Sequence, residues 1–437
     1  MDHSITIDPR RCLGCTTCMK VCPTEAIRVR RGKATVLDER CIDCARCSRH
    51  CPHKAVRAAS DPLSMLEGCR YAVALPDPTL YGQFQNLDDI ERILNALLAT
   101  GFDSVYETAK AAGLLSDYAR RYAKKEAAAA PEKKPLISSA CPAVLRLIRK
   151  RFPHLISHII PVITPMELAA ILARRDAAER TGIPPEEIGV FAIVPCSAQV
   201  TAVHRPDDLQ NPVIDGAISV RDMYLKLLAP MKDLRELRPL SMAGRSGVSW
   251  AFVGGESYSR QDERFLAVDG IGQVIQVLEA IEDDRIPDVD FVELSACVHG
   301  CVGGGLTVEN PFVAAMHIRR LIKDLPFCRS DFDAEVRDVS LILADKELEF
   351  SPAFLLDDDR DEAMKKLQAI GRLERELPGI LCGSCGAPSC HAFAEDVVLG
   401  RAERSDCIFQ VRANVRAAAG GEDPDRFLPP PFRRKNT

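Results

Sequence analysis

The chain has 437 residues, which is enough for roughly three domains and excludes a small disulfide-stapled scaffold. Its 57 basic and 62 acidic residues nearly balance, so the charge favours neither a nucleic-acid groove nor an anionic membrane surface. The first residues contain no apolar run long enough for a signal peptide or a membrane span, so we expect a cytoplasmic protein. Eighteen cysteines in a reducing compartment indicate metal coordination instead of disulfides.

The N-terminal segment carries two similar runs of the form C-x2-C-x2-C-x3-C-P. In such runs three cysteines of one run and the last cysteine of the other bind each 4Fe-4S cubane, because the tight loops reach only three corners. Zinc is the alternative, although zinc sites usually pair two short C-x2-C elements. We therefore expect two clusters, which resemble those of bacterial two-cluster ferredoxins. Their ligands are Cys12, Cys15, Cys18 and Cys51 for the first, and Cys41, Cys44, Cys47 and Cys22 for the second.

The long middle section alternates short apolar runs with helical patterns, which is typical of an α/β layer structure. Four runs are expected as strands that lead into loops, and three of these loops carry a cysteine. Open α/β sheets place their ligands at such strand ends. The expected strands are 71–75, 136–137, 188–194 and 291–294, and the cysteines that follow the last three are Cys141, Cys196, Cys297 and Cys301. Glycines 303 to 305 come directly after them and would let the backbone approach a bulky ligand, so we expect a cofactor cage.

Beyond residue 329 the periodicity weakens, and we expect a connector on the surface over 329–362. An amphipathic helix is expected from Met364 to Leu377, where Pro378 ends it. A further cysteine set, C-x2-C-x4-C-x16-C, follows and is expected to bind a fourth cubane, with zinc again as the alternative. It consists of Cys382, Cys385, Cys390 and Cys407, and it resembles the small 4Fe-4S domain of corrinoid iron-sulfur proteins. Cys69 and Cys328 remain as structural thiols.

The three middle cysteine segments resemble the FeFe hydrogenases, whose motifs read T-S-C-C-P, M-P-C-x-x-K and E-x-M-A-C-x-G-G-C followed by glycines. The resemblance covers about residues 70 to 325 and includes 105–108, 244–255 and 268–272. It implies that Cys141, Cys196, Cys297 and Cys301 hold a cubane. It also implies that Cys301 bridges to a two-iron subcluster with carbon monoxide, cyanide and dithiolate ligands, that Gly303 and Gly304 border this cofactor, and that the whole forms an H-cluster.

Several positions depart from the family pattern. Ala140 replaces the cysteine that passes protons in catalytic members, and a methyl group can neither donate nor accept a proton. Gln199 replaces the lysine and carries no charge to stabilise a reduced cofactor. Ser295, Val194 and His299 also differ from the pattern. We expect His299 either to relay protons in place of the missing thiol or to tune the cofactor through a hydrogen bond.

These features predict an α/β multidomain protein. We expect a ferredoxin module at 1–60, a two-lobed hydrogenase domain at 61–328, the connector, a mostly helical 4Fe-4S domain at 363–420 and a loose tail at 421–437. The predicted function is a divergent, slow or sensory hydrogenase that exchanges electrons with a redox partner such as ferredoxin and needs maturation enzymes. A sensory role would require a separate signalling partner. The alternatives are a cluster-assembly protein without the two-iron subcluster and a plain electron-transfer subunit.

Overall fold

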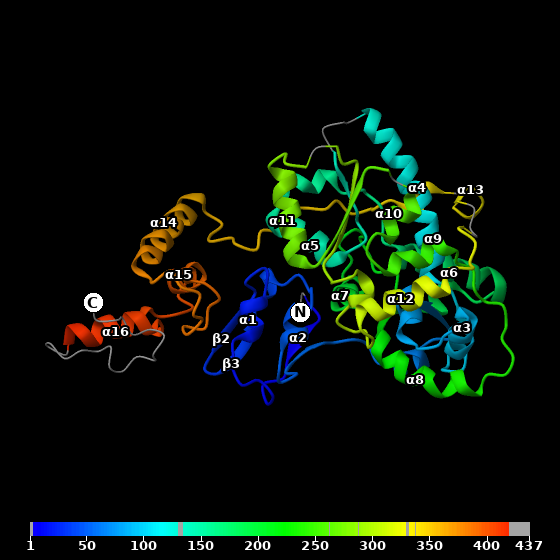
Figure 1. Cartoon of the computed structure of the whole chain (residues 1–437), viewed down its shortest axis with the longest axis horizontal. Coiled ribbons are helices and arrows are strands. Elements are labelled where there is room, and N and C mark those ends of the chain that lie inside the picture. Colours follow the sequence, from blue (N-terminus) through cyan, green and yellow to red (C-terminus); the bar gives the residue numbers. More distant parts are fainter. Residues whose placement is uncertain are drawn as a thin grey trace. The chain divides into compact units, whose positions relative to one another are not determined.

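The computed structural model describes residues 3–129, 134–261, 263–286, 288–328, 332–336 and 338–418. These residues form two compact units, coloured along the sequence in Figure 1. The large unit consists of Met1–Thr6, Ile42–Arg49 and Arg57–Pro352, and the small unit of Ile7–Cys41, His50–Val56 and Ala353–Thr437. The expected tail at 421–437 lies outside the described residues, and the two units do not coincide with the segments expected from the sequence.

The large unit contains two parallel sheets, one in each lobe, so the two-lobed α/β architecture is confirmed. The four-stranded sheet has the order β6-β5-β8-β9, and the three-stranded sheet has the order β10-β11-β7. The strand bounds are β5 Tyr71–Pro76, β6 Ser104–Val105, β7 Leu136–Ile137, β8 Ile188–Val194, β9 Gly216–Ser219, β10 Phe265–Asp269 and β11 Phe291–Ser295. All four strands expected from the sequence are therefore present.

The central strands of the four-stranded sheet are buried on both faces. Along β8, Val190, Ala192 and Val194 join one core cluster, whereas Phe191 and Ile193 join another. Successive side chains of a strand point to opposite faces, so a strand with helices on both sides needs an unbroken apolar run. This explains why 188–194 contains no polar residue.

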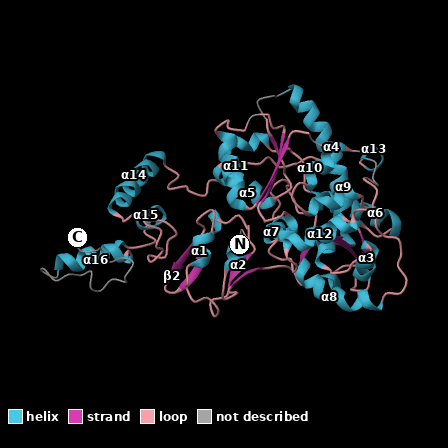
Figure 2. Cartoon of the chain, in the orientation of Figure 1, coloured by secondary structure: helices cyan, strands magenta, loops and turns pink. Residues whose placement is uncertain are grey.

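Helices cover both sheets of the large unit. In Figure 2 the strands of the three-stranded sheet run between α11 and α5 on one side and α10 on the other. The larger helices are α3 Ile90–Leu98, α4 Thr108–Ala129, α5 Pro142–Arg151, α6 Pro165–Thr181, α7 Ser197–His204, α8 Val220–Asp233, α10 Gly255–Arg260, α11 Ile271–Glu282 and α12 Pro311–Leu321. The shorter ones are α2 Arg46–His50, α9 Arg245–Val248 and α13 Phe332–Glu335, and strands β1 Ile5–Ile7 and β4 Val56–Ala58 pair with each other.

The segment expected as a surface connector is partly buried, so that expectation is wrong for its middle. Phe332, Val336 and Ile342 belong to the main core cluster of the large unit, and Leu343 forms a β-bridge with Val162. Helix α13 Phe332–Glu335 is only four residues long, and Ile342 and Leu343 lie outside it, so no long periodic pattern in the sequence marks this burial.

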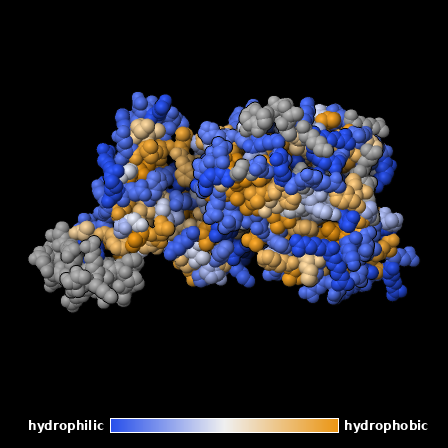
Figure 3. Space-filling view, turned by 45° about the horizontal axis from the view of Figure 1, so that its top comes forward, coloured by the Kyte–Doolittle hydropathy of each residue, from blue (hydrophilic) through white to orange (hydrophobic). Residues whose placement is uncertain are grey.

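The small unit combines a ferredoxin-like hairpin with the C-terminal helices. Strands β2 Ile27–Arg30 and β3 Lys33–Val36 are antiparallel and follow helix α1 Thr17–Val21. The C-terminal part contains α14 Arg360–Glu376, α15 Cys390–Val398 and α16 Ile408–Ala418. Helix α14 confirms the amphipathic helix expected before Pro378. In Figure 3 apolar surface is visible on this part of the chain, where Met364, Leu367 and Leu381 are exposed.

Candidate iron-sulfur sites and cavity

Four cysteines of the large unit converge where strands of both sheets end. Cys141 follows β7 and precedes α5, and Cys196 follows β8 and precedes α7. Cys297 and Cys301 lie in the loop after β11. Burial raises the pKa of the Cys297 thiol to about 11, and it raises that of Cys301 further, where the neighbouring thiols of the set add repulsion. Thiols packed this closely in a buried place are suited to a metal cluster, which binds thiolates directly.

Two of the glycines after Cys301 lie in close contact with backbone oxygen atoms. A Cβ atom on Gly303 would lie 2.0 Å from the Val298 carbonyl oxygen, and one on Gly304 would lie 2.2 Å from the Pro195 oxygen. Leu306 N also donates to this Pro195 oxygen at 2.8 Å. Gly304 therefore lets the loops that carry Cys196 and Cys301 pack against each other, and Gly303 lets the turn between Cys297 and Cys301 close on itself; neither glycine lines the cavity.

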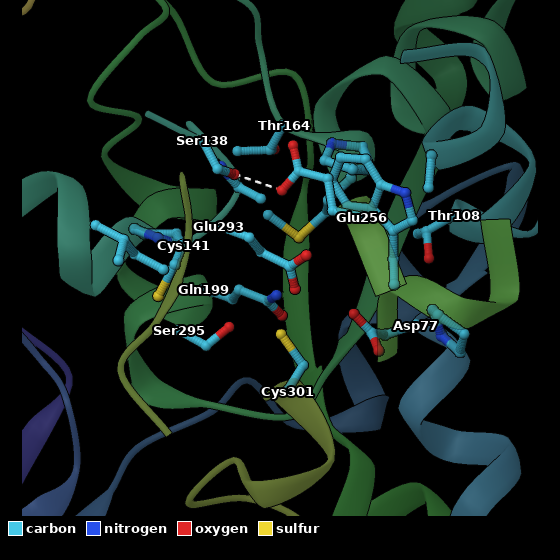
Figure 4. A pocket seen from close by; sticks show the side chains of 18 residues that line it. Asp77, Thr108, Ser138, Cys141, Thr164, Gln199, Glu256, Glu293, Ser295 and Cys301 are labelled. Atoms are coloured by element: carbon cyan, nitrogen blue, oxygen red, sulfur yellow. Dashed lines mark hydrogen bonds between the residues drawn. The ribbon is translucent and has the colours of Figure 1, made fainter. Parts of the chain in front are cut away.

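A cavity lies beside these cysteines, and the side chains around it come from many elements (Figure 4). Cys301 and Cys141 face it together with Gln199, Ser295 and Ala140, so four of the five residues expected at a catalytic site line it. The polar lining also includes residues that sequence reasoning missed, namely Asp77, Thr108, Ser138, Thr164, Glu256 and Glu293 among the labelled side chains. Thr108, Ser138 and Glu293 lie within segments that carry the family resemblance, but none of the six was expected at the catalytic site.

The fifth expected residue, His299, is placed elsewhere. Its ring stacks on that of Phe312 with a centroid distance of 4.7 Å, and Phe312 is itself exposed. Burial and the positive charge of Arg319 lower the pKa of His299. His299 has a positive φ of 67° in the tight turn between Cys297 and Cys301, and it is not among the residues that line the cavity. Its expected role as a proton relay or as a tuner of the cofactor stays a prediction.

The cavity has a hydrogen-bonded pair of a serine and a glutamate close to Ala140. Ser138 Oγ donates a hydrogen bond to Glu256 Oε2 at 2.5 Å, and the backbone N–H of Ala140 donates to Ser138 Oγ at 3.1 Å. Both side chains are buried. Glu256 lies at the start of α10, far from Ser138 in the sequence, so no local pattern could have linked them.

Two further acids of the lining have raised pKa values. Burial raises the pKa of Asp77, which accepts from Thr79 N at 2.8 Å and is also stabilised by the Gln199 amide. Burial likewise raises the pKa of Glu293, although its carboxylate accepts hydrogen bonds from Gly254 N, Ser257 N and Ser257 Oγ. The lining therefore has three acids and no lysine or arginine.

The loop that carries Cys44 and Cys47 is anchored to the helices that begin at this cysteine set. Asp43 is buried and accepts from Arg146 Nη1 on α5 at 3.0 Å and from Thr201 Oγ1 on α7 at 2.8 Å. Ser197, which follows Cys196, donates to the Asp43 carbonyl at 2.7 Å. Burial raises the pKa of Asp43, and Arg146 partly offsets this shift. The ferredoxin ligands on this loop therefore lie close to the buried cysteine set.

The first ferredoxin set is complete within the small unit. Cys12, Cys15, Cys18 and Cys51 line one cavity together with Val29 and Ala34, as the cross-ligation of the two runs predicts. Burial raises the pKa of Cys18 to about 11. Of the second set, Cys22 and Cys41 belong to the small unit and Cys44 and Cys47 to the large unit.

The terminal set also gathers within the small unit. Cys390 begins α15, and Cys407 directly precedes α16. Burial raises the pKa of Cys385, to which Cys382 and Cys407 contribute repulsion, and it raises the pKa of Cys390 in the same way. Cys69 and Cys328 belong to none of these sets.

This fold and these cysteine sets define an iron-sulfur protein with 4Fe-4S sites. The model for the iron-only hydrogenase large subunit, C-terminal domain, matches residues 70–249 and 232–305, more than half of the chain. The chain therefore belongs to the iron-only hydrogenase large subunit family. A 4Fe-4S dicluster domain matches residues 4–52, and an Fe-S cluster family matches residues 377–409.

Individual relatives include two kinds of protein. The periplasmic Fe hydrogenase large subunit of Nitratidesulfovibrio vulgaris is 27% identical over 72% of this chain and 89% of its own length. The cytosolic Fe-S cluster assembly factor nar1 of Aspergillus terreus is 29% identical over 27% of this chain and 20% of its own length. The solved FeFe-hydrogenase HydA(deltaEFG) has a TM-score of 0.50 and 15% identity, with 64% of this chain and 95% of that chain covered, which shows a shared fold.

The residues present fit a cubane in the large unit, since four half-buried cysteines converge. For a two-iron subcluster the fit is mixed. Cys301 faces the cavity, and the buried Gln199 Oε1 accepts no hydrogen bond within the described part of the chain, so this amide is available to a ligand. Three acids oppose an anionic group unless they hold protons, and the raised pKa values of Asp77 and Glu293 favour the protonated forms.

Proposed function

We propose that this chain is a divergent FeFe hydrogenase that carries out or senses the reaction 2H+ + 2e- ⇌ H2, with 4Fe-4S clusters as its electron path. The observation that carries the proposal is the cavity directly beside the four converging cysteines, with Cys301 on its wall. Cys141, Cys196, Cys297 and Cys301 would hold the cubane, and Cys301 would bridge to a two-iron subcluster. That group would supply an open metal position that polarises dihydrogen.

The side chains of the cavity would accept and donate protons and would stabilise the charge of the cofactor. Ser138 and Glu256 form the hydrogen-bonded pair nearest to Ala140, so Glu256 Oε2 is the proton acceptor that we assign to the cavity. The Gln199 amide would donate to a cyanide ligand without adding charge. Ser295 would offer a hydroxyl where the family usually has a methionine. We expect a one-electron protein such as a ferredoxin to supply electrons, maturation enzymes to insert the subcluster, and a separate partner to take up any signal.

A second candidate is an iron-sulfur protein without the two-iron subcluster, in cluster assembly or electron transfer. The observation that favours it is the lining of three acids without a basic side chain, since an anionic cofactor would be repelled in a medium of low dielectric. The partial likeness to Fe-S cluster assembly factors agrees with this candidate.

Infrared spectroscopy separates the two candidates. The full chain is reconstituted with iron and sulfide without oxygen, where four cubanes predict about sixteen iron atoms per chain. It is then supplied with the two-iron cofactor. Bands of metal-bound carbon monoxide and cyanide, together with hydrogen evolution from a reduced dye, are expected. Normal iron content without these bands would favour the second candidate.

A further inference from the structure

The terminal cysteine set packs directly on strand β2 of the ferredoxin module. Val29 N donates to the carbonyl oxygen of Gly386 at 2.9 Å, and Gly386 directly follows Cys385. Val29 also lines the cavity formed by Cys12, Cys15, Cys18 and Cys51. A single residue of β2 therefore lies between the first ferredoxin set and the terminal set.

Two glycines of the terminal loop allow this close approach. A Cβ atom on Gly386 would lie 1.8 Å from the Val29 carbonyl oxygen, and one on Gly383 would lie 2.9 Å from Met19 Cε. Both glycines have a positive φ, which L side chains rarely adopt. Met19 is buried and directly follows Cys18. The loop from Cys382 to Cys385 thus contacts the helix that carries a ligand of the first set.

Buried ion pairs hold the two parts in this arrangement. Asp396 Oδ2 accepts from Arg28 Nε at 2.7 Å and from Arg30 Nη2 at 2.8 Å, and the Arg28 and Asp396 side chains are only 5% and 2% exposed. Arg30 Nη1 also donates to the Cys385 carbonyl. Charges are buried only where they are paired, because an unpaired one would lose its hydration without compensation.

The neighbouring acid repeats this pattern. Glu395 forms a buried ion pair with Arg40, whose guanidinium lies 4.4 Å from the ring centroid of Phe354. Both acids are on α15, which begins at Cys390, and the three arginines lie between the two cysteine runs of the ferredoxin module. A cubane needs only its cysteine ligands, so these ion pairs between α15 and the ferredoxin module are not required for cluster binding itself.

We propose that the terminal cluster exchanges electrons directly with the first ferredoxin cluster, and that Asp396, Arg28 and Arg30 are the positioning residues for this transfer. One electron leaves the terminal cubane in its 1+ state and enters the ferredoxin cubane in its 2+ state, with no bond or proton changed. An external one-electron donor supplies it. Electron transfer slows steeply with distance, so a fixed contact through Val29 and Gly386 gives a short route. The proposal rests on the cubanes of the proposed function and not on its hydrogen chemistry.

Electron paramagnetic resonance of the full, reconstituted chain tests this proposal. Reduced cubanes are paramagnetic, and two close neighbours broaden and split each other's signals. We compare the fully reduced chain with a Cys382→Ser variant that lacks the terminal cluster, and with a Cys15→Ser variant that disturbs the first cluster. The signal of the terminal cluster is expected to sharpen when the first cluster is disturbed. A signal of the terminal cluster that is the same in the unmodified chain and in Cys15→Ser would overturn the proposal.

The role of the ion pairs is tested with Asp396→Asn, which removes the charged partner of the buried Arg28 and of the half-buried Arg30. The magnetic interaction is expected to be lost while iron content stays at the wild-type value. Arg401→Gln is the matched control, because Arg401 pairs with Glu39 in the same unit at 3.6 Å and both side chains are about half exposed. An unchanged interaction in Asp396→Asn would remove the positioning role. Should this variant lose terminal iron, the comparison with Cys15→Ser still decides on direct transfer, and the infrared bands of the large unit report separately on the proposed function.

Discussion

Ala140 stands where the family pattern has a cysteine, so any proton supplied at this place must come from neighbouring side chains. A methyl group cannot carry a proton, but the Ser138 hydroxyl and the Glu256 carboxylate lie in the same cavity wall and share a hydrogen bond. His299 is not part of this wall, and its ring stacks on that of Phe312. Glu256 is therefore the acid that the structure offers for exchange with a cofactor in the cavity.

Glu256→Gln is expected to lower hydrogen evolution, because an amide keeps the hydrogen bond to Ser138 but cannot exchange a proton. General acid-base groups contribute about 10²- to 10⁴-fold, so a loss of about 10²-fold is expected. Rates with a reduced dye are measured next to infrared spectra that report cofactor content. His299→Ala is the control and should leave the rate close to wild type. If both variants keep the wild-type rate with a full cofactor, protons take another route.

Ala140→Cys tests the same step by adding a group. A thiol at this position would stand beside Ser138, so a rate higher than that of the wild type is expected. The gain should be partial, because the hydrogen-bonded pair of Ser138 and Glu256 already stands in this wall. Ala140→Ser provides a polar control of similar size. An unchanged rate in Ala140→Cys would show that proton delivery here is not limiting.

Gln199 is a neutral side chain that lines the cavity together with Asp77, where the cofactor is expected. Gln199→Lys is expected to raise the reduction potential of the cofactor, since a cation stabilises an added electron in a medium of low dielectric. Infrared spectroelectrochemistry measures this potential. Gln273→Lys adds the same charge at an exposed position of α11 and should leave the potential unchanged. A potential that is equal or lower in Gln199→Lys would mean that residue 199 does not contact the cofactor.

At the level of elements, the loops after β8 and β11 bring cysteines from two sheets together, and Gly304 permits their contact. Gly304→Ala would place a Cβ atom 2.2 Å from the Pro195 oxygen, so the loops must separate. Loss of about four iron atoms per chain is expected, with the ferredoxin clusters spared. Gly272→Ala is the control, because its Cβ would meet only Arg46 Nη1 at 3.8 Å. Equal iron content in the two variants would contradict this role of Gly304.

The elements that the sequence predicted are those with a local signal. The apolar run 188–194 and the helical spacing from Met364 to Leu377 lie within single elements, and the structure has β8 and α14 there. The short cysteine spacings at 12–22, 41–51 and 382–390 are local signals of the same kind, whereas the four cysteines of the large unit come together only in the folded chain. In contrast, the Ser138–Glu256 and Asp396–Arg28 pairs join residues more than 100 positions apart, and only the folded chain brings them together. The burial of Ile342 likewise depends on tertiary packing.

For the whole molecule, no helix among the described residues is long and apolar enough to cross a membrane. The buried acids of the large unit make the stability of the fold depend on pH. Glu167 lies in the first turn of α6 and forms a capping box with Thr164, where its Oε2 accepts from Thr164 N at 2.8 Å and from Thr164 Oγ1 at 2.7 Å. Burial raises the pKa of Glu167 to about 8, and the negative charge of Asp208 adds to the shift. Thr164 also lines the cavity, so this cap lies at the site itself.

A glutamate in an unfolded chain has a pKa of about 4.3, so the folded state binds this proton more tightly than the unfolded state does. The stabilisation is complete below about pH 4 and is lost as the pH rises towards the folded value of about 8. The melting temperature of the reconstituted protein is therefore expected to fall between pH 5 and pH 8. Each unit of pKa difference corresponds to about 1.4 kcal/mol, which makes the change measurable.

Glu167→Gln separates this effect from other titrations, because the amide oxygen can still accept from Thr164 while the group no longer ionises. Its melting temperature should depend less on pH than that of the wild type. Some dependence should remain, since burial also raises the pKa of Asp208, to about 6. Glu186→Gln, at an exposed position in the same unit, should follow the wild-type curve. Parallel curves for Glu167→Gln and the wild type between pH 5 and pH 8 would show that Glu167 is not protonated in the fold, and the buried pair would then need a cation to balance its charge.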